Sequence, residues 1–314
     1  MVMAIPMVAE QCNRYRRPFW PCLNARSGLR AFLQTVPFGP RDIVLLPSYI
    51  GWSPREGSGV FDPIAELQLP ADFYRMDDQL HVDLAVLEQI LQNGRTKVVV
   101  LIHYFGYVDP GYPEAIRLAR RYGAAVVEDE AHALYSDLLG ACGRQGDAVI
   151  FSLHKMLPTK TGGLLLIRPG WPGSPEPIRP AAQAWTSPWE YDLQAIAQVR
   201  RQNAAELTRL LAGLEDDVQL LWPDVPANVV PQTLPVLIRR VSRDRLYQAM
   251  NDDGFGVVSL YHTLIPQIQQ ERFPESNQLS RWIMNLPVHQ DVPPGALAAM
   301  VEALGRHLHL LTAK

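Results

Sequence analysis

The chain has 314 residues, of which 47% are hydrophobic and 19% charged, and its formal net charge is −3. This composition is typical of a globular protein of one large or two modest domains, and it lacks the excess positive charge of a nucleic-acid-binding protein. The three cysteines are widely spaced and no apolar run reaches the roughly 18 residues of a membrane helix, which argues against a disulfide framework, a CxxC zinc site and membrane insertion and favours the cytoplasm.

The amino-terminal residues 1–24 are predicted to form an arm, because prolines interrupt any regular period there. A helix is predicted next, at 29–36, with Asn24 or Ser27 as its cap. Because Ser27 and Gly28 open this helix, its free backbone N–H groups suit a phosphate. A plain capped surface helix is the alternative on this feature alone.

The next part of the chain alternates between strands and helices. Short apolar runs predict buried strands at 43–46, 97–103, 124–127, 148–151 and 164–167. Helical spacing predicts helices at 82–92 and 112–122. Strand, helix and strand at this spacing indicate βαβ units and a parallel sheet.

The carboxyl-terminal part begins with a long amphipathic helix predicted at 193–214. A second alternation of strands and helices follows at 234–239, 242–252, 257–260 and 294–311. We therefore expect a three-layer α/β sandwich with a mostly parallel central sheet, and a small α+β domain after it. The expected units are the arm at 1–24, a large domain at 25–200 and a small domain at 201–314.

Polar side chains follow two of the predicted strands. Asp129 and His132 come after the strand at 124–127, and Ser152 and Lys155 come at the end of the strand at 148–151. The carboxyl ends of parallel strands meet at one edge of a sheet, where α/β proteins bind ligands.

An acid and a lysine at such an edge suit pyridoxal phosphate. The lysine forms a Schiff base with the cofactor, the carboxylate keeps the pyridine nitrogen protonated, and a phosphate cup holds the other end. Lys155, Asp129 and the helix start at Ser27 and Gly28 would supply these three parts, and Ser152 would hydrogen-bond the same phosphate.

The motifs SGxxA, PSY, EDxAH, FS…K and GG, in this order, resemble the DegT/DnrJ/StrS sugar aminotransferases, which are fold-type-I pyridoxal phosphate enzymes. The resemblance covers roughly residues 24–311. It implies that Asp129 binds the pyridine nitrogen, that His132 lies at the ring, and that Lys155, eight residues before Gly163, is the Schiff-base lysine.

The resemblance also suggests which residues contact the phosphate and the ring of the cofactor. Ser27, Gly28 and Leu29 stand where the family has its SGT phosphate loop, so one hydroxyl contact is lost. Tyr49 and Trp52 are both candidates for the aromatic ring that stacks on the cofactor. Three further departures are a serine only three residues before the lysine, a missing GxNxR partner loop near 181–192, and a reversed order of Tyr261 and His262.

The function that we expect is amino transfer from an amino acid to a keto group of a nucleotide-linked sugar or a similar small metabolite. The resemblance implies a homodimer. Three alternatives stay open: another pyridoxal phosphate reaction such as decarboxylation, racemisation or dehydration; a non-catalytic or regulatory protein of the same fold; and a metal-dependent hydrolase. The hydrolase would use an O/N ligand set of His103, Asp129, His132 and His154. Lys160 is the rival amine.

Overall fold

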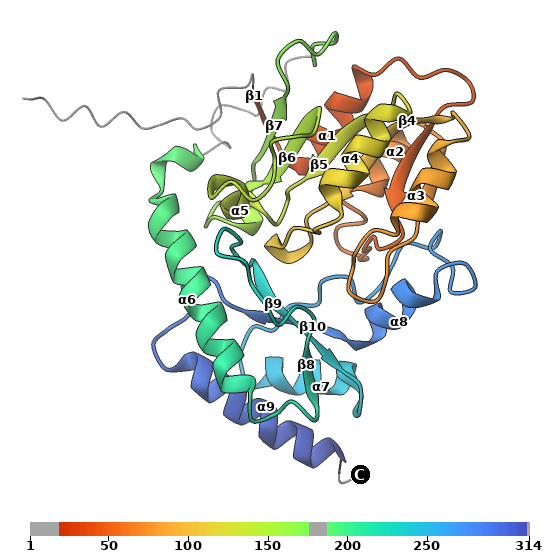
Figure 1. The fold of residues 1–314 in the computed structure, drawn as a ribbon. Helices are drawn as coiled ribbons and strands as arrows, with labels where there is room; N and C mark the ends of the chain where they lie inside the picture. Colours follow the sequence, from red (N-terminus) through yellow and green to blue (C-terminus); the bar gives the residue numbers. More distant parts are fainter. Residues whose placement is uncertain (1–18, 176–186, 313–314) are drawn as a thin grey trace, which may run out of the picture.

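The computed structural model describes residues 19–175 and 187–312. A seven-stranded sheet, in the order β1-β7-β6-β5-β4-β2-β3, forms the centre of the larger part, and a three-stranded antiparallel sheet, β10-β9-β8, lies in the smaller part (Figure 1). The predicted α/β fold with a mostly parallel central sheet and a smaller α+β unit is confirmed. Residues 1–18 of the predicted arm lie outside the described residues.

The strands of the large sheet are β1 (Phe19–Cys22), β2 (Ile43–Pro47), β3 (Ala71–Tyr74), β4 (Thr96–Ile102), β5 (Ala125–Asp129), β6 (Ala148–Ser152) and β7 (Gly163–Ile167). The α-helices of this part are α1 (Ala25–Gln34), α2 (Phe61–Glu66), α3 (Leu84–Leu91), α4 (Tyr112–Arg121) and α5 (Leu134–Leu138). β2, β3, β4, β5 and β6 run parallel, whereas β7 is antiparallel to β6.

Helices cover both faces of this sheet, which explains why its strands are apolar on both sides. On one face α1 packs closely, since a Cβ at Gly28 would lie 3.5–3.6 Å from Leu165 and Ile150. On the other face Phe151 belongs to a separate buried cluster that includes residues of α5 and of α6 (Leu193–Leu211). Figure 1 shows α6 running down one side of the molecule toward the smaller part.

The smaller part is built from β8 (Val218–Leu220), β9 (Thr233–Ile238), β10 (Ile283–Pro287), α7 (Arg243–Asp252), α8 (Pro274–Trp282) and α9 (Ala296–Thr312). α6, α7 and α9 bury apolar side chains against β9 and β10, so this part has a core of its own. The domain boundary predicted at residue 200 falls inside α6, which contacts both α5 and α9.

Three sequence expectations differ from the structure. Residues 19–22 of the predicted arm form β1, which pairs with β7 and closes the sheet edge. α1 begins at Ala25, because Asn24 and Ser27 form a reciprocal capping box in which Asn24 is the cap. Residues 257–260 form no strand and make one isolated bridge, from Val258 to Asn285. At 19–22 and at 257–260, contacts with distant residues decide the local structure.

Gly106 is a tight junction between the two parts of the molecule. Its φ of +90° is unfavourable for other residues, and an added Cβ would collide with the Val230 carbonyl oxygen and lie 2.9 Å from the Gln232 nitrogen. We therefore expect Gly106→Ala to lower the free energy of unfolding by about 3 kcal/mol or more, from backbone strain and overpacking together. Denaturant titration measures this loss.

The matched control is Gly94→Ala. Gly94 has a φ of +66° with no atom within 4 Å of an added Cβ, so only the backbone cost of about 1–2 kcal/mol is expected. Equal losses for the two variants would show that the junction at Gly106 is not closely packed.

Candidate active site

Asp129 and Lys155 lie at the carboxyl ends of two neighbouring parallel strands. Asp129 is the last residue of β5 and pairs in register with Ile150 of β6. Lys155 ends a 3₁₀ turn, Leu153–Lys155, that follows β6 directly. The two side chains interact, because the Asp129 carboxylate partly opposes the effect of burial, which lowers the pKa of Lys155. The predicted meeting of acid and amine is therefore present.

His132 contacts the amine of Lys155. Its Nε2 lies 3.0 Å from Lys155 Nζ, and its Nδ1 accepts the backbone N–H of Phe105 at 3.2 Å. Burial lowers the pKa of His132 well below its usual value, so the ring is neutral. A neutral imidazole that accepts at Nδ1 carries its proton on Nε2, and this N–H donates to Lys155 Nζ. This contact favours the neutral form of the amine over the ammonium ion.

Burial has the opposite effect on Asp129. It raises the pKa of this carboxyl, while the Ala131 N–H, which Oδ1 accepts at 2.9 Å, and the charge of Lys155 lower it. Because Asp129 is buried away from water, a positively charged group beside it stabilises the ionised carboxylate.

An aromatic wall of Tyr49, Tyr104, Phe105 and Tyr261 closes one side of the site. Tyr261 stacks on Tyr49 with ring centroids 5.1 Å apart and meets the edge of His132 at 6.1 Å. Burial raises the pKa of Tyr261, and the negative charge of Asp129 adds to this shift. Tyr261 and Phe105 therefore both contact His132, and Tyr261 is the ring on which the charge of Asp129 acts.

The two predicted stacking candidates have different environments. Tyr49 is fully buried behind Tyr261, whereas Trp52 is 42% exposed on the loop after β2. The sequence did not predict Tyr261 as a site residue. Its signal was the pair Tyr261 and His262, whose order is reversed relative to the family.

The amino end of α1 differs from the expected phosphate cup. Ser27 is committed to the cap, since its Oγ donates to Asn24 O at 2.8 Å and its N–H donates to Asn24 Oδ1 at 2.8 Å. The Gly28 N–H donates to Asn24 O at 3.3 Å, and Leu29 is buried in the core. The first turn of α1 instead presents Ala25 and Arg26.

Arg26, in the first turn of α1, is a further candidate beyond the predicted site residues. Its positive charge lowers the pKa of Lys155, after the larger effect of burial, so its guanidinium lies near the amine. It donates to the carbonyl of Glu56 and lies 3.7 Å from Asp62, while its buried Nε has no hydrogen-bond partner among the described residues. The signal in the sequence was a basic residue in the first turn of the helix.

The structure also shows where Ser152, Lys160 and the alternative metal ligands lie. Ser152 is buried at the end of β6 and hydrogen-bonds His154 Nδ1 at 3.2 Å. The rival amine Lys160 is exposed. The alternative metal set of His103, Asp129, His132 and His154 is not assembled, because the one group that the described residues offer an ion combines His103 with Glu130 and Cys142.

Comparison with known proteins finds a match to a family of aminotransferases. Residues 22–169, which include Asp129, His132 and Lys155, match the model of the DegT/DnrJ/EryC1/StrS aminotransferase family. The resemblance seen in the sequence is thereby confirmed.

Solved structures of similar fold cover nearly the whole chain. The aminotransferase TlmJ from Streptoalloteichus hindustanus is 23% identical, with a TM-score of 0.74 over 94% of this chain and 86% of TlmJ. The putative sugar aminotransferase Spr1654 from Streptococcus pneumoniae, in its PLP-form, is 16% identical, with a TM-score of 0.74 over 95% of this chain and 88% of Spr1654. An aminotransferase of the DegT family from Brucella abortus is 18% identical, with a TM-score of 0.72 over 93% and 86%.

Proposed function

We propose that the protein is a pyridoxal-phosphate-dependent aminotransferase that transfers an amino group from an amino acid to a keto group of a nucleotide-linked sugar or a similar small metabolite. The observation that carries this proposal is the amine of Lys155 held against His132, with the charge of Asp129 acting on the same amine. The match to an aminotransferase family model supports the reaction type, and the PLP-form of Spr1654 supports the cofactor.

The residues present fit the cofactor at both ends. Bound pyridoxal phosphate supplies an aldehyde for an amine and a pyridine ring that accepts electrons from the substrate carbon. Asp129 would hold a proton on the ring nitrogen, because a carboxylate at contact distance raises the pKa of that nitrogen. The orphaned, buried Nε of Arg26 is an unused donor at the amino end of α1, where a phosphate fits.

Lys155 would act twice. Burial lowers the pKa of Lys155, and the contact with His132 Nε2 at 3.0 Å favours the neutral amine, which is the form that attacks a carbonyl. After the amino group of the substrate has displaced Lys155 from the cofactor, the same Nζ would take the proton from the substrate carbon as a general base. It would then donate this proton to another atom as a general acid. Burial keeps the pKa of Lys155 below its usual value, which favours both proton transfers near neutral pH.

We infer that Arg26 replaces the hydroxyl that is missing from the phosphate cup. Changing Arg26→Gln should weaken binding of pyridoxal phosphate by about 10- to 100-fold, the cost of one or two charged hydrogen bonds. Titration of cofactor absorbance measures the dissociation constant directly. Arg30→Gln is the matched control, since Arg30 is exposed one turn later and pairs with Glu66. Equal affinities of the two variants for pyridoxal phosphate would show that Arg26 does not bind the phosphate.

The test of the function is a half-reaction. Purified protein with pyridoxal phosphate is mixed with single amino acids, and the cofactor absorbance at about 410–430 nm is followed. We expect an amino-acid donor, glutamate first among them, to bleach this band and leave the aminated cofactor and a keto acid. A protein that stays colourless after addition of pyridoxal phosphate would support the non-catalytic alternative instead.

The finer expectations concern the acceptor and the assembly. Spr1654 is described as a putative sugar aminotransferase, which supports a sugar acceptor. We propose a homodimer in the cytoplasm, as the family resemblance implies. No helix of the described residues is long and apolar enough to cross a membrane.

A further inference from the structure

Three side chains from separate segments meet beside the carboxyl end of β5. His103 follows β4, Glu130 follows β5, and Cys142 lies on the loop between α5 and β6. All three are buried, with at most 6% of any of them exposed. One potential ligand atom of each lies within 4.8 Å of the other two, and His103 Nε2 is 3.9 Å from Glu130 Oε1.

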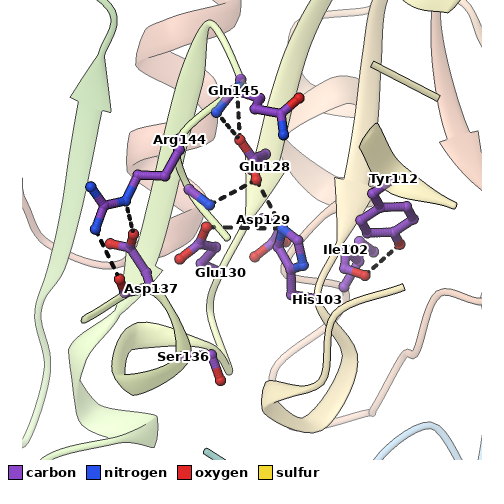
Figure 2. Close-up of polar contacts among 12 residues, drawn as sticks. Ile102, His103, Tyr112, Glu128, Asp129, Glu130, Ser136, Asp137, Arg144 and Gln145 are labelled. Carbon is purple, nitrogen blue, oxygen red and sulfur yellow. Dashed lines mark hydrogen bonds and ion pairs between the residues drawn. The ribbon is translucent and has the colours of Figure 1, made fainter. Parts of the chain in front are cut away.

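Glu128 organises this group, as Figure 2 shows. Its Oε2 lies 3.1 Å from His103 Nε2 and accepts the Gly143 N–H at 2.9 Å. Its Oε1 accepts the N–H groups of Gln145 at 3.1 Å and Gly146 at 2.5 Å. A single carboxylate therefore ties the imidazole to the loop that carries Cys142.

The charges of the group favour a cation. The carboxylates of Glu128 and Glu130 both face the same imidazole nitrogen, at 3.1 and 3.9 Å (Figure 2). Two buried carboxylates of like charge are costly unless protons or a positive ion neutralise them.

The donor set is one that zinc prefers. Thiolate sulfur, imidazole nitrogen and carboxylate oxygen are its usual protein ligands, and the combination with sulfur disfavours magnesium and calcium. We propose that His103, Glu130 and Cys142 bind a zinc ion. Binding would form the Zn–S bond and release the thiol proton to solvent.

The geometry requires a small contraction. Tetrahedral zinc with bonds of about 2.0–2.3 Å places its ligand atoms roughly 3.3–3.8 Å apart. The loop at 139–147 contains Gly140, Gly143 and Gly146, so Cys142 can approach the other two ligands without moving a strand. The ion would join the ends of β4 and β5 to the loop before β6, which is a structural role that does not depend on the proposed function.

Zinc content tests the inference. We expect the full-length protein, expressed with zinc and dialysed against metal-free buffer, to retain one zinc ion per chain by elemental analysis. Cys142→Ser should lose at least nine-tenths of this zinc. Cys22→Ser is the matched control and should retain it, because Cys22 is an equally buried thiol that contacts the start of α1 rather than this group.

A second measurement uses the wild-type chain, so that poor folding of a variant does not decide the result. Cobalt added in place of zinc should give a thiolate-to-cobalt charge-transfer band in the near ultraviolet and intense tetrahedral bands in the visible, both absent from Cys142→Ser. No zinc and no charge-transfer band in the wild type would overturn the inference, as would equal zinc in the wild type and Cys142→Ser. Pyridoxal phosphate binding is measured separately, so failure of either proposal is recognised by itself.

Discussion

Lys155→Ala is expected to abolish amino transfer, with a loss of at least about 10⁴-fold in kcat. The amine that binds the cofactor and moves the proton is removed, and neither His132 nor the exposed Lys160 can replace both roles. The cofactor band at about 410–430 nm should also vanish, because that band depends on a lysine–cofactor bond. Borohydride reduction followed by mass spectrometry provides a third measurement, since the wild type gains the mass of the cofactor and the variant does not.

The matched control for this substitution is Lys160→Ala. Lys160 lies on the same loop but is exposed, so its removal should leave the absorbance, the reduced adduct and the turnover unchanged. If Lys160→Ala lost the adduct and Lys155→Ala kept it, the assignment of the amine would be wrong. If neither variant nor the wild type formed an adduct, the non-catalytic alternative would stand.

Asp129→Asn should separate cofactor binding from turnover. The amide is similar in shape to the carboxylate, so the variant should fold and keep a coloured cofactor on Lys155. It cannot hold a proton on the ring nitrogen by charge, and the electron-accepting power of the ring falls. We expect kcat to fall by about 10²–10³-fold, the usual effect of removing one preorganised electrostatic partner in a buried site.

Asp109→Asn is the control for loss of a buried carboxylate elsewhere. Asp109 accepts the backbone N–H groups of Val82 and Gly111 at 2.6 Å each, so its replacement should lower stability and leave the rate per bound cofactor unchanged. A rate for Asp129→Asn within a factor of three of the wild type would mean that this carboxylate does not face the ring nitrogen.

These two predictions depend on the same structural relation. Neighbouring parallel strands bring Asp129 and Lys155 to one edge of the sheet, where His132 contacts the amine of Lys155. A metal-dependent hydrolase would need the imidazole and carboxylate side chains to converge on an ion at this place. His132 instead uses Nδ1 for the Phe105 N–H and Nε2 for Lys155.

The sequence by itself determined the strands and the residues that follow them. A strand buried on both faces is a continuous apolar run, so β2, β4, β5, β6 and β7 were visible without coordinates. The side chain that follows such a run must lie at the end of the strand. Asp129 and Lys155 were therefore placed correctly from local information and one rule of α/β topology.

The start of α1 could not be decided from local signals. Asn24 and Ser27 were both acceptable caps, and the structure uses Asn24 as the cap with Ser27 as its reciprocal partner. With Asn24 as the cap, the turn that has free backbone N–H groups begins three residues earlier than a cap at Ser27 would place it. This cap places Gly28 and Leu29 inside the helix and leaves Ala25 and Arg26 in the first turn.

Only the tertiary structure decided which distant residues meet. Tyr261 comes from the loop before α8 and joins Tyr49 and His132 in the large part of the molecule, although its own segment carries no periodic pattern. His103, Glu130 and Cys142 likewise converge from three segments that a search for CxxC spacing cannot connect. Local sequence encodes a buried strand and the residues that follow it, whereas contacts between loops depend on how the whole chain packs, and no short pattern records them.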